Sequence, residues 1–226
     1  MRKLLAFLVL LLVLVAILDR VAVAGVEKEI ATRATARYDL ASPPEVAIHG
    51  IPFLTQAVAG RYEQVEVAVG SMTVAGVRLS AVDATLYGVT APLADLVTRA
   101  DQVDIRAERV VGTVEVGEEA LNQRAPQGLT VQAGPGGLDV SGEITFLGRK
   151  VPAEARLKVE VTEKGLRLLP EKVELGGGIT VPDPERFLRY EIPIRNLPFN
   201  LKITKVEPVT GGLRITAEAS DVPLRG

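Results

Sequence analysis

A strict two-residue alternation of apolar and polar side chains restricts the fold of this chain more than any other feature. Ala155, Leu157, Val159 and Val161 occupy every second position of the segment 154–162. The positions between them are polar or charged: Glu154, Arg156, Lys158, Glu160 and Thr162. Successive side chains of a β-strand point to opposite faces of its sheet. The alternation therefore predicts a strand with one buried and one solvated face, as is typical of antiparallel sheets.

Turn residues join further alternating segments into hairpins. Residues 213–219 alternate in the same way after a Gly211-Gly212 turn that follows the apolar segment 201–206, which predicts a C-terminal hairpin. Residues 162–165 provide a turn at the end of the strand described above. The glycine-rich segment 134–137 has no helical pattern after it, which favours a hairpin loop over a phosphate-binding loop.

The segment before these hairpins predicts a meander with one irregularity. Residues 65–69 and 77–81 both alternate, and Ala75-Gly76 lies between them as a turn. Within residues 103–116 the apolar set moves from odd to even positions near Glu108 and Arg109. A β-bulge accounts for this change of phase.

Helix signals are few. Pro92 in a first turn predicts a helix over residues 91–100, and Asp183 before Pro184 predicts the start of another. Residues 117–124 and 26–38 are the third and fourth predicted helices. The sequence therefore predicts an α+β fold with a mostly antiparallel sheet of about ten strands.

The side chains available to fill such a sheet are small. Its inward positions are mostly Val, Leu, Ile and Ala, and aromatic residues make up only 4% of the chain. A packed core, a long helix laid on the sheet and an elongated apolar cavity all fit such a face. A strand of about nine residues spans about 30 Å, comparable with an acyl chain. The pattern alone favours the packed core.

The N-terminus has the features of a secretory signal. Arg2 and Lys3 precede an uninterrupted apolar run over residues 4–18, which Asp19 and Arg20 end. A helix of that length rises about 22 Å, which is short of a hydrocarbon core of about 30 Å and favours a signal peptide.

Two outcomes are open for this signal. Ala22 and Ala24 offer a cleavage site, whereas residues 26–38 could continue the helix as a signal anchor. Both outcomes place the rest of the chain outside the cytoplasmic membrane, because the basic residues stay inside. Residues 1–24 are therefore predicted to be a signal peptide or signal anchor, and residues 25–226 a single extracytoplasmic domain.

Composition excludes several kinds of chemistry. The chain has no cysteine, so disulfides, thiolate metal sites and cysteine nucleophiles are absent. Its one histidine, His49, excludes a metal site built on several imidazoles. With 26 basic and 28 acidic residues there is no strong field to hold a nucleic-acid backbone. We expect no metal, no organic cofactor and no nucleic-acid partner.

Two groups of motifs resemble a known family. The string HGIPFLTQ at residues 49–56, followed by GRY at 60–62, resembles the GFPFLTQ signature of the actinobacterial LmeA family of phospholipid-binding cell-envelope proteins. At the C-terminus the matching strings are NLPF at 196–199, KIT at 202–204, GLRI at 212–215 and DVPL at 221–224. One departure is Ile51, where the family usually has phenylalanine; the position stays apolar.

The resemblance implies a fold and a set of binding residues. The family is similar to tubular lipid-binding domains, in which a strongly curved antiparallel sheet wraps a long helix and encloses acyl chains. The implied lipid-binding residues are apolar side chains of the motif segments and of inward strand positions: Ile51, Pro52, Phe53, Leu54, Val67, Leu157, Val159, Phe199, Leu213 and Ile215. A phospholipase A activity attributed to a family member makes hydrolysis an alternative.

The segment Ile51-Pro52-Phe53-Leu54 has two interpretations. It is either a hydrophobic loop that closes one end of the sheet, or a membrane-docking loop through which a lipid passes from the bilayer to the cavity. Leu197-Pro198-Phe199 repeats the Pro-Phe pair far along the chain.

Catalytic signatures are weak. A serine hydrolase typically carries Gly-x-Ser-x-Gly, and this string does not occur here. Only His49 could serve as a base, and its position after the predicted strand 46–48 favours an exposed histidine. We therefore predict no catalytic residues.

The sequence predicts a protein of the cell envelope, secreted or membrane-anchored, that binds a phospholipid or related glycolipid in an elongated apolar cavity for presentation or transfer. The expected partners are the lipid and a membrane surface; the oligomeric state stays open. A lipid esterase and a structural envelope module without ligand are the alternatives. Fatty-acid release that depends on His49 or a serine favours the esterase, and failure to take up lipid favours the structural module.

Overall fold

A computed structural model describes residues 2–74, 77–91, 105–146, 148–163, 165–176, 178–184, 190–193 and 197–224. Two compact units divide the chain. Unit 1 comprises residues 1–70, 83–111 and 219–226, and unit 2 comprises residues 71–82 and 112–218. The predicted single domain over 25–226 stays a prediction.

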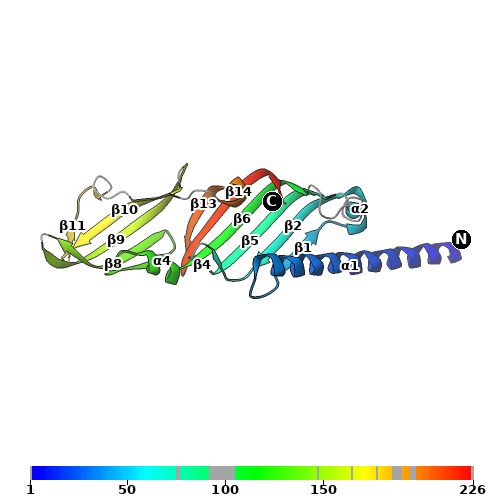
Figure 1. Cartoon of the computed structure of the whole chain (residues 1–226), viewed down its shortest axis with the longest axis horizontal. Helices are drawn as coiled ribbons and strands as arrows, with labels where there is room; N and C mark the ends of the chain where they lie inside the picture. Colours follow the sequence, from blue (N-terminus) through cyan, green and yellow to red (C-terminus); the bar gives the residue numbers. More distant parts are fainter. Residues whose placement is uncertain are drawn as a thin grey trace. The chain divides into compact units, whose positions relative to one another are not determined.

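Unit 1 combines a long helix with part of a sheet (Figure 1). The helix α1 (Arg2–Tyr38) is followed by β1 (Glu45–His49), α2 (Phe53–Ala59) and β2 (Arg61–Val69). The strands β5 (Ala81–Thr90), β6 (Arg106–Gly117) and β14 (Gly212–Pro223) contribute their unit 1 residues, in the order β1-β2-β5-β6-β14. The register of β1 and β2 places Val46 opposite Val67 and Ile48 opposite Val65.

The helix α1 packs beside β1 and α2 through its C-terminal half. It is one continuous element of 37 residues, so the predicted helix 26–38 is correct but begins far upstream, within the signal segment. It ends where Asp39 adopts a positive φ of 48°.

Unit 2 contains a sheet of its own with strand order β11-β10-β9-β8-β7, in which β12 also pairs with β10. The bounds are β7 (Leu129–Gly134), β8 (Gly137–Phe146), β9 (Arg149–Thr162), β10 (Gly165–Leu175), β11 (Ile179–Thr180) and β12 (Tyr190–Pro193). The other elements are β3 (Met72–Val74), β4 (Val77–Leu79), α4 (Glu118–Arg124), the 3₁₀ turn η2 (Pro198–Asn200) and β13 (Lys202–Val209), with the unit 2 residues of β6 and β14. The unit 2 residues of β6 and β14, together with β13, have the strand order β6-β14-β13.

The predicted fold class is confirmed. The chain is α+β, with a long N-terminal helix and large antiparallel sheets that do not close into a barrel. The predicted hairpins join β7 to β8, β9 to β10, and β13 to β14. The predicted helix 117–124 corresponds to α4.

The predicted meander was wrong in its pairing. Residues 77–81 do not form one strand beside residues 65–69: β2 lies between β1 and β5, while β4 pairs with the short strand β3. Gly70 and Ser71 interrupt the alternation after β2, which leaves residues 72–74 free to pair locally with residues 77–79.

In β6 the change of phase is present, because Glu108 and Arg109 are both exposed between buried Ala107 and buried Val110. The β-bulge itself stays a prediction. Most of the predicted helix 91–100, and the helix predicted after Pro184, fall on residues 92–104 and 185–189, outside the described residues.

Candidate functional site

The loop between β1 and β2 is organised around one buried glutamine. The side-chain Nε2 of Gln56 donates to the His49 carbonyl oxygen at 3.1 Å, and its Oε1 accepts from the Glu63 backbone N–H at 2.9 Å. Gly50 has a φ of +105°, and a Cβ there would lie 2.5 Å from Gln56 Nε2. Only glycine fits this position, because the backbone has a positive φ and because a Cβ would collide with the side chain of Gln56.

The apolar residues of this loop divide into buried and exposed sets. Phe53 is buried against Tyr62, with ring centroids 6.0 Å apart, and burial raises the pKa of Tyr62. Ile51, Leu54 and Val58 are exposed by 84%, 37% and 81% of their surfaces. Leu54 and Val58, four residues apart, lie on one side of α2, and Ile51 precedes the helix; we call these three exposed side chains the α2 apolar face.

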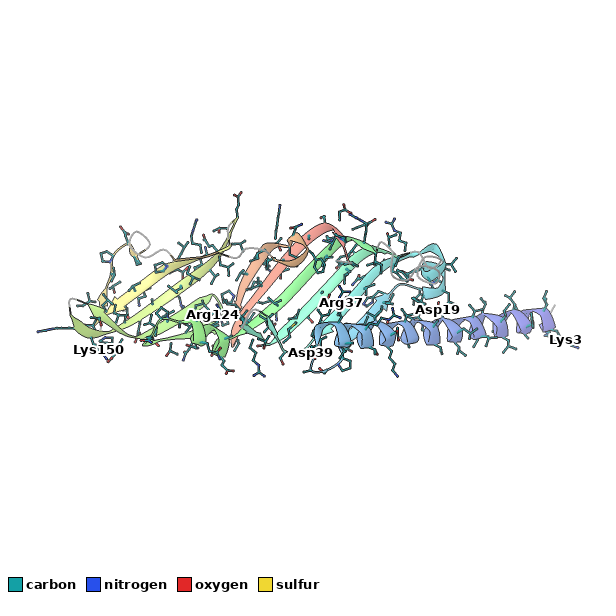
Figure 2. All side chains as sticks on the ribbon, in the orientation of Figure 1. Lys3, Asp19, Arg37, Asp39, Arg124 and Lys150 are labelled. Atoms are coloured by element: carbon teal, nitrogen blue, oxygen red, sulfur yellow. The ribbon has the colours of Figure 1, made fainter. Side chains whose placement is uncertain are left out.

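The carboxylate of Asp19 caps α2 from a distant part of the chain. Asp19 Oδ1 accepts the Leu54 backbone N–H at 2.8 Å, and Arg20 pairs with the same carboxylate. Its side chain is nearly inaccessible. The Arg20 guanidinium and the backbone N–H of Leu54 lower the pKa of Asp19, because both stabilise its charged form. Figure 2 shows Asp19 partway along α1, between Lys3 at the free end and Asp39 at the other.

Sequence reasoning missed this role of Asp19, because it interpreted the Asp19-Arg20 pair only as the end of the apolar run. The signal in the sequence was the carboxylate of Asp19 inside a continuous helical pattern, because a buried carboxylate needs a hydrogen-bond donor or an opposite charge as its partner.

In unit 2 the antiparallel registers place apolar side chains on one face of the sheet. Val151 and Ala155 of β9 lie opposite Ile144 and Val140 of β8, and Leu157 lies opposite Leu138. Since directly paired residues point to the same side, these positions share a face with the adjoining strands. The same face includes Val131 and Ala133 of β7 and Leu168, Pro170, Val173 and Leu175 of β10. We call this set the unit 2 apolar face.

Coverage of the unit 2 apolar face changes along the strands. At one end Leu138, Val159 and Leu166 are buried in a cluster with Leu213 of β14. Further side chains packed on the cluster come from α4, β13 and β14: Leu121, Ile203, Val206 and Ile215. Toward the other end Val151 and Ala155 of β9 are only half-buried, while Val173 of β10, opposite Ala155, is buried. Along β9 the face therefore runs from a packed core to a partly open apolar surface.

The opposite side of this sheet is charged. Arg156 and Asp139 are directly paired across β9 and β8, and the guanidinium binds both carboxylate oxygens at 2.8 and 2.9 Å. This fork lowers the pKa of Asp139 and raises that of Arg156. The contrast between the two sides follows from the alternation that predicted the strand.

The ten predicted lipid-binding residues lie in both units. Leu157, Val159, Leu213 and Ile215 belong to the cluster of unit 2. The other unit 2 residue is Phe199, which is 44% exposed before β13 and has a φ of +58°. Unit 1 holds residues 51–54, in and before α2, and the half-buried Val67 of β2.

Several apolar positions escaped the sequence prediction. Val58 and the half-buried β9 residues Val151, Ala153 and Ala155 were not among the predicted residues. Alanine carries little hydrophobic signal by itself, and its place on the face depends on pairing between strands.

The polar groups weighed for catalysis have structural neighbours. His49 Nε2 lies 3.1 Å from Glu66 Oε2, and both side chains are about half-exposed. Among the described residues no cluster of three or more His, Asp or Glu has the arrangement of a metal site.

Comparison with known proteins gives one match. A protein-family model described as LmeA-like phospholipid-binding matches residues 17–218. No curated protein and no solved structure matches the chain.

Proposed function

The chain belongs to the LmeA-like phospholipid-binding family, and from this premise we propose that it holds a phospholipid or related glycolipid on the unit 2 apolar face. The lipid-binding residues are Leu157, Val159, Leu213 and Ile215 at the covered end, with Val151, Ala153 and Ala155 at the open end. In this arrangement the cavity is elongated along β9, and the acyl chains take the place of a second packed layer.

The observation that carries the proposal is the incomplete burial of the inward row of β9. Val151, Ala153, Ala155 and Leu157 alternate with exposed Pro152, Glu154 and Arg156, yet all four are only half-buried. A sheet face of a soluble module is ordinarily covered by another layer. From Val151 to Val159 the row extends about 26 Å at about 3.3 Å per residue, which suits an acyl chain.

Burial alone supplies the affinity. Each methylene removed from water contributes about 0.8 kcal/mol, so an acyl chain needs no charged clamp along its length. Polar side chains at the rim of such a site orient the headgroup and set specificity.

We place this activity outside the cytoplasmic membrane, in the cell envelope. The apolar run of the N-terminal helix is preceded by the basic residues Arg2 and Lys3, which stay on the cytoplasmic side. The membrane surface is then the source or the acceptor of the lipid. Ile51 and Leu54 are exposed apolar side chains available for that contact, and exposed Pro52 and buried Phe53 lie between them in the chain. Presentation or transfer of the bound lipid follows from such contact.

The experiment is to measure the lipid that co-purifies with the full chain and to compare two neighbouring lysine variants. Ala153→Lys puts a charge on the unit 2 apolar face, while Glu154→Lys puts the same side chain on the opposite side of β9, which is exposed. We expect stoichiometric phospholipid with the natural chain and with Glu154→Lys, and at least a tenfold loss with Ala153→Lys.

Circular dichroism and thermal unfolding of both variants verify that the fold is retained. Equal lipid content in the two variants, or no lipid in the natural chain even after incubation with phospholipid vesicles, contradicts the proposal. Fatty acid released during that incubation indicates hydrolysis instead.

A further inference from the structure

The helix α1 has two halves with different surroundings. Every described residue before Asp19 is exposed, and residues 2–18 carry the apolar run. From Asp19 onward a stripe of buried or half-buried side chains follows at spacings of three and four residues: Asp19, Ala22, Val23, Glu27, Ile30, Ala31, Ala34 and Thr35. This spacing is that of a helix with one face packed on the rest of its unit. The packed half begins at Asp19.

Two side chains of the packed half bind the backbone of unit 1. Asp19 accepts the Leu54 N–H at the start of α2, and Glu27 Oε1 accepts the Ile48 N–H of β1 at 2.8 Å. Val23, between them, is buried. Cleavage after Ala24 would remove both Asp19 and Val23 from the folded unit. The family match also begins before this point, at residue 17.

We propose that residues 1–24 are retained, so that α1 is an uncleaved signal anchor, and that Asp19 holds the α2 apolar face in the outer interface of the same bilayer. The proposal rests on the extracytoplasmic location given under the proposed function. It adds the processing state of the chain, a membrane-facing surface and a positioning residue.

The short apolar run links retention of the anchor to membrane contact by the α2 apolar face. Residues 4–18 rise about 22 Å as a helix, about 8 Å less than a typical hydrocarbon core. A short span draws its flanking residues toward the membrane. The first flanking residue, Asp19, is bonded to Leu54, so the α2 apolar face is drawn in with it.

Asp19 and the α2 apolar face have the polarity that suits the boundary of a bilayer. Ile51, Leu54 and Val58 are exposed apolar side chains, which gain free energy when they enter the interface. The Asp19 carboxylate has partners in Arg20 and the Leu54 N–H, and satisfied polar groups are tolerated near hydrocarbon. The occupant of this surface is therefore the phospholipid bilayer that α1 spans through residues 4–18.

The first test is the mass and partition of the full chain expressed in a bacterial host. We expect the protein to stay in membranes washed with alkaline carbonate, and its intact mass to include residues 1–24. A chain that begins at Gly25, or that carbonate releases, overturns the proposal. Lipid co-purification measured on the same material is independent, so lipid binding by a cleaved chain refutes this inference and leaves the proposed function in place.

The second test exploits the absence of cysteine in the natural chain. Val58→Cys and the control Ser42→Cys are labelled with an environment-sensitive fluorophore in the full chain, reconstituted in phosphatidylcholine–phosphatidylglycerol vesicles. Ser42 is exposed beyond the C-terminal end of α1, about 30 Å along the helix from Asp19. We expect blue-shifted emission, and quenching by nitroxide-labelled lipid, at position 58 and not at position 42.

The role of Asp19 is tested in the labelled Val58→Cys protein. Asp19→Ala is expected to shift the emission toward that of the aqueous control, while Glu29→Ala, which removes an exposed carboxylate from the same helix, leaves it unchanged. Equal aqueous emission at positions 58 and 42 overturns the docking surface. A blue shift that depends on protein concentration, without quenching by labelled lipid, indicates a second copy of the chain and also overturns it.

Discussion

At the scale of single residues, unit 1 depends on two buried polar side chains that bind backbone groups. Gln56 joins the end of β1 to β2, and Asp19 joins α1 to the start of α2. Gln56 lies against Gly50, whose missing side chain leaves room for the glutamine. The string at residues 49–56 is therefore a structural junction as well as the carrier of exposed apolar residues.

Replacement of Gln56 by alanine is expected to destabilise the fold. It removes two part-buried hydrogen bonds, to the His49 carbonyl and from the Glu63 N–H, and each such bond contributes about 0.5–1.5 kcal/mol. We expect the free energy of unfolding in urea to fall by about 1–3 kcal/mol. Gln123→Ala, at an exposed position of α4, is the control and should change it by less than about 0.5 kcal/mol. Equal effects of the two substitutions would contradict this role of Gln56.

The Asp19 contact predicts a defined pH dependence. The lowered pKa of Asp19 in the fold means that its charged form stabilises the protein above the unfolded pKa of about 3.9. This contribution is lost as the pH falls through the lower, folded pKa. The stability difference between the natural chain and Asp19→Asn should therefore be constant from about pH 5 to 8 and shrink below about pH 4.

Thermal unfolding of the two proteins across this range measures the effect. Glu29→Gln, which removes an exposed carboxylate, should change stability little over the same range. A difference that persists unchanged to about pH 2 would show that the charge of Asp19 has no role.

At the scale of elements, the strands with strict alternation and glycine turns could be predicted from the sequence, and the short strands could not. Residues 154–162 have an uninterrupted period of two, so tertiary contacts only strengthen what the pattern demands. Residues 72–74 and 77–79 are too short to show a period, and their pairing is decided by contacts. The continuity of α1 was left open by the sequence, because Asp19 and Arg20 interrupt the apolar run and the Asp19 partner in α2 lies far along the chain.

The start of β14 lies so close to β6 that one methyl group added at Gly212 is expected to destabilise the fold. A Cβ at Gly212 would lie 2.3 Å from the carbonyl oxygen of Val116, a backbone atom that cannot move aside. Gly212→Ala should lower the free energy of unfolding by about 1–3 kcal/mol, because overpacking forces a backbone shift. Gly134→Ala is the control, since its Cβ meets nothing within 4 Å. Denaturant unfolding of both variants measures the difference, and equal stability would contradict the proposed clash.

At the scale of the whole molecule, the candidate site was predictable only in part. Leu157, Val159, Leu213 and Ile215 have inward positions in strong alternating patterns, and the structure gathers them in one cluster. The half-buried end of the unit 2 apolar face could not be anticipated. Its openness depends on which strands pair with β9 and on where β13 and β14 stop covering the sheet, and neither is encoded in local periodicity.

Bound lipid should stabilise the folded chain through mass action. A ligand at 100 times its Kd adds about 2.7 kcal/mol to the free energy of unfolding, which for a protein of this size raises Tm by about 5–11 °C. Calorimetry with increasing phospholipid, in the natural chain and in Ala153→Lys, measures this effect. A Tm that does not depend on phospholipid in the natural chain would contradict binding to the folded state.

Because α1 is one continuous helix, the number of residues before Asp19 also fixes the direction in which the rest of unit 1 faces around the helix axis. One residue added between Leu18 and Asp19 would turn the rest of unit 1 by about 100° around the helix axis relative to residues 2–18, and move it about 1.5 Å along that axis. Seven added residues would return it to within about 20° of its original bearing, but about 10 Å farther along. If the anchor is not cleaved, the number of residues in α1 would therefore fix both the orientation of the rest of unit 1 and its height above the bilayer.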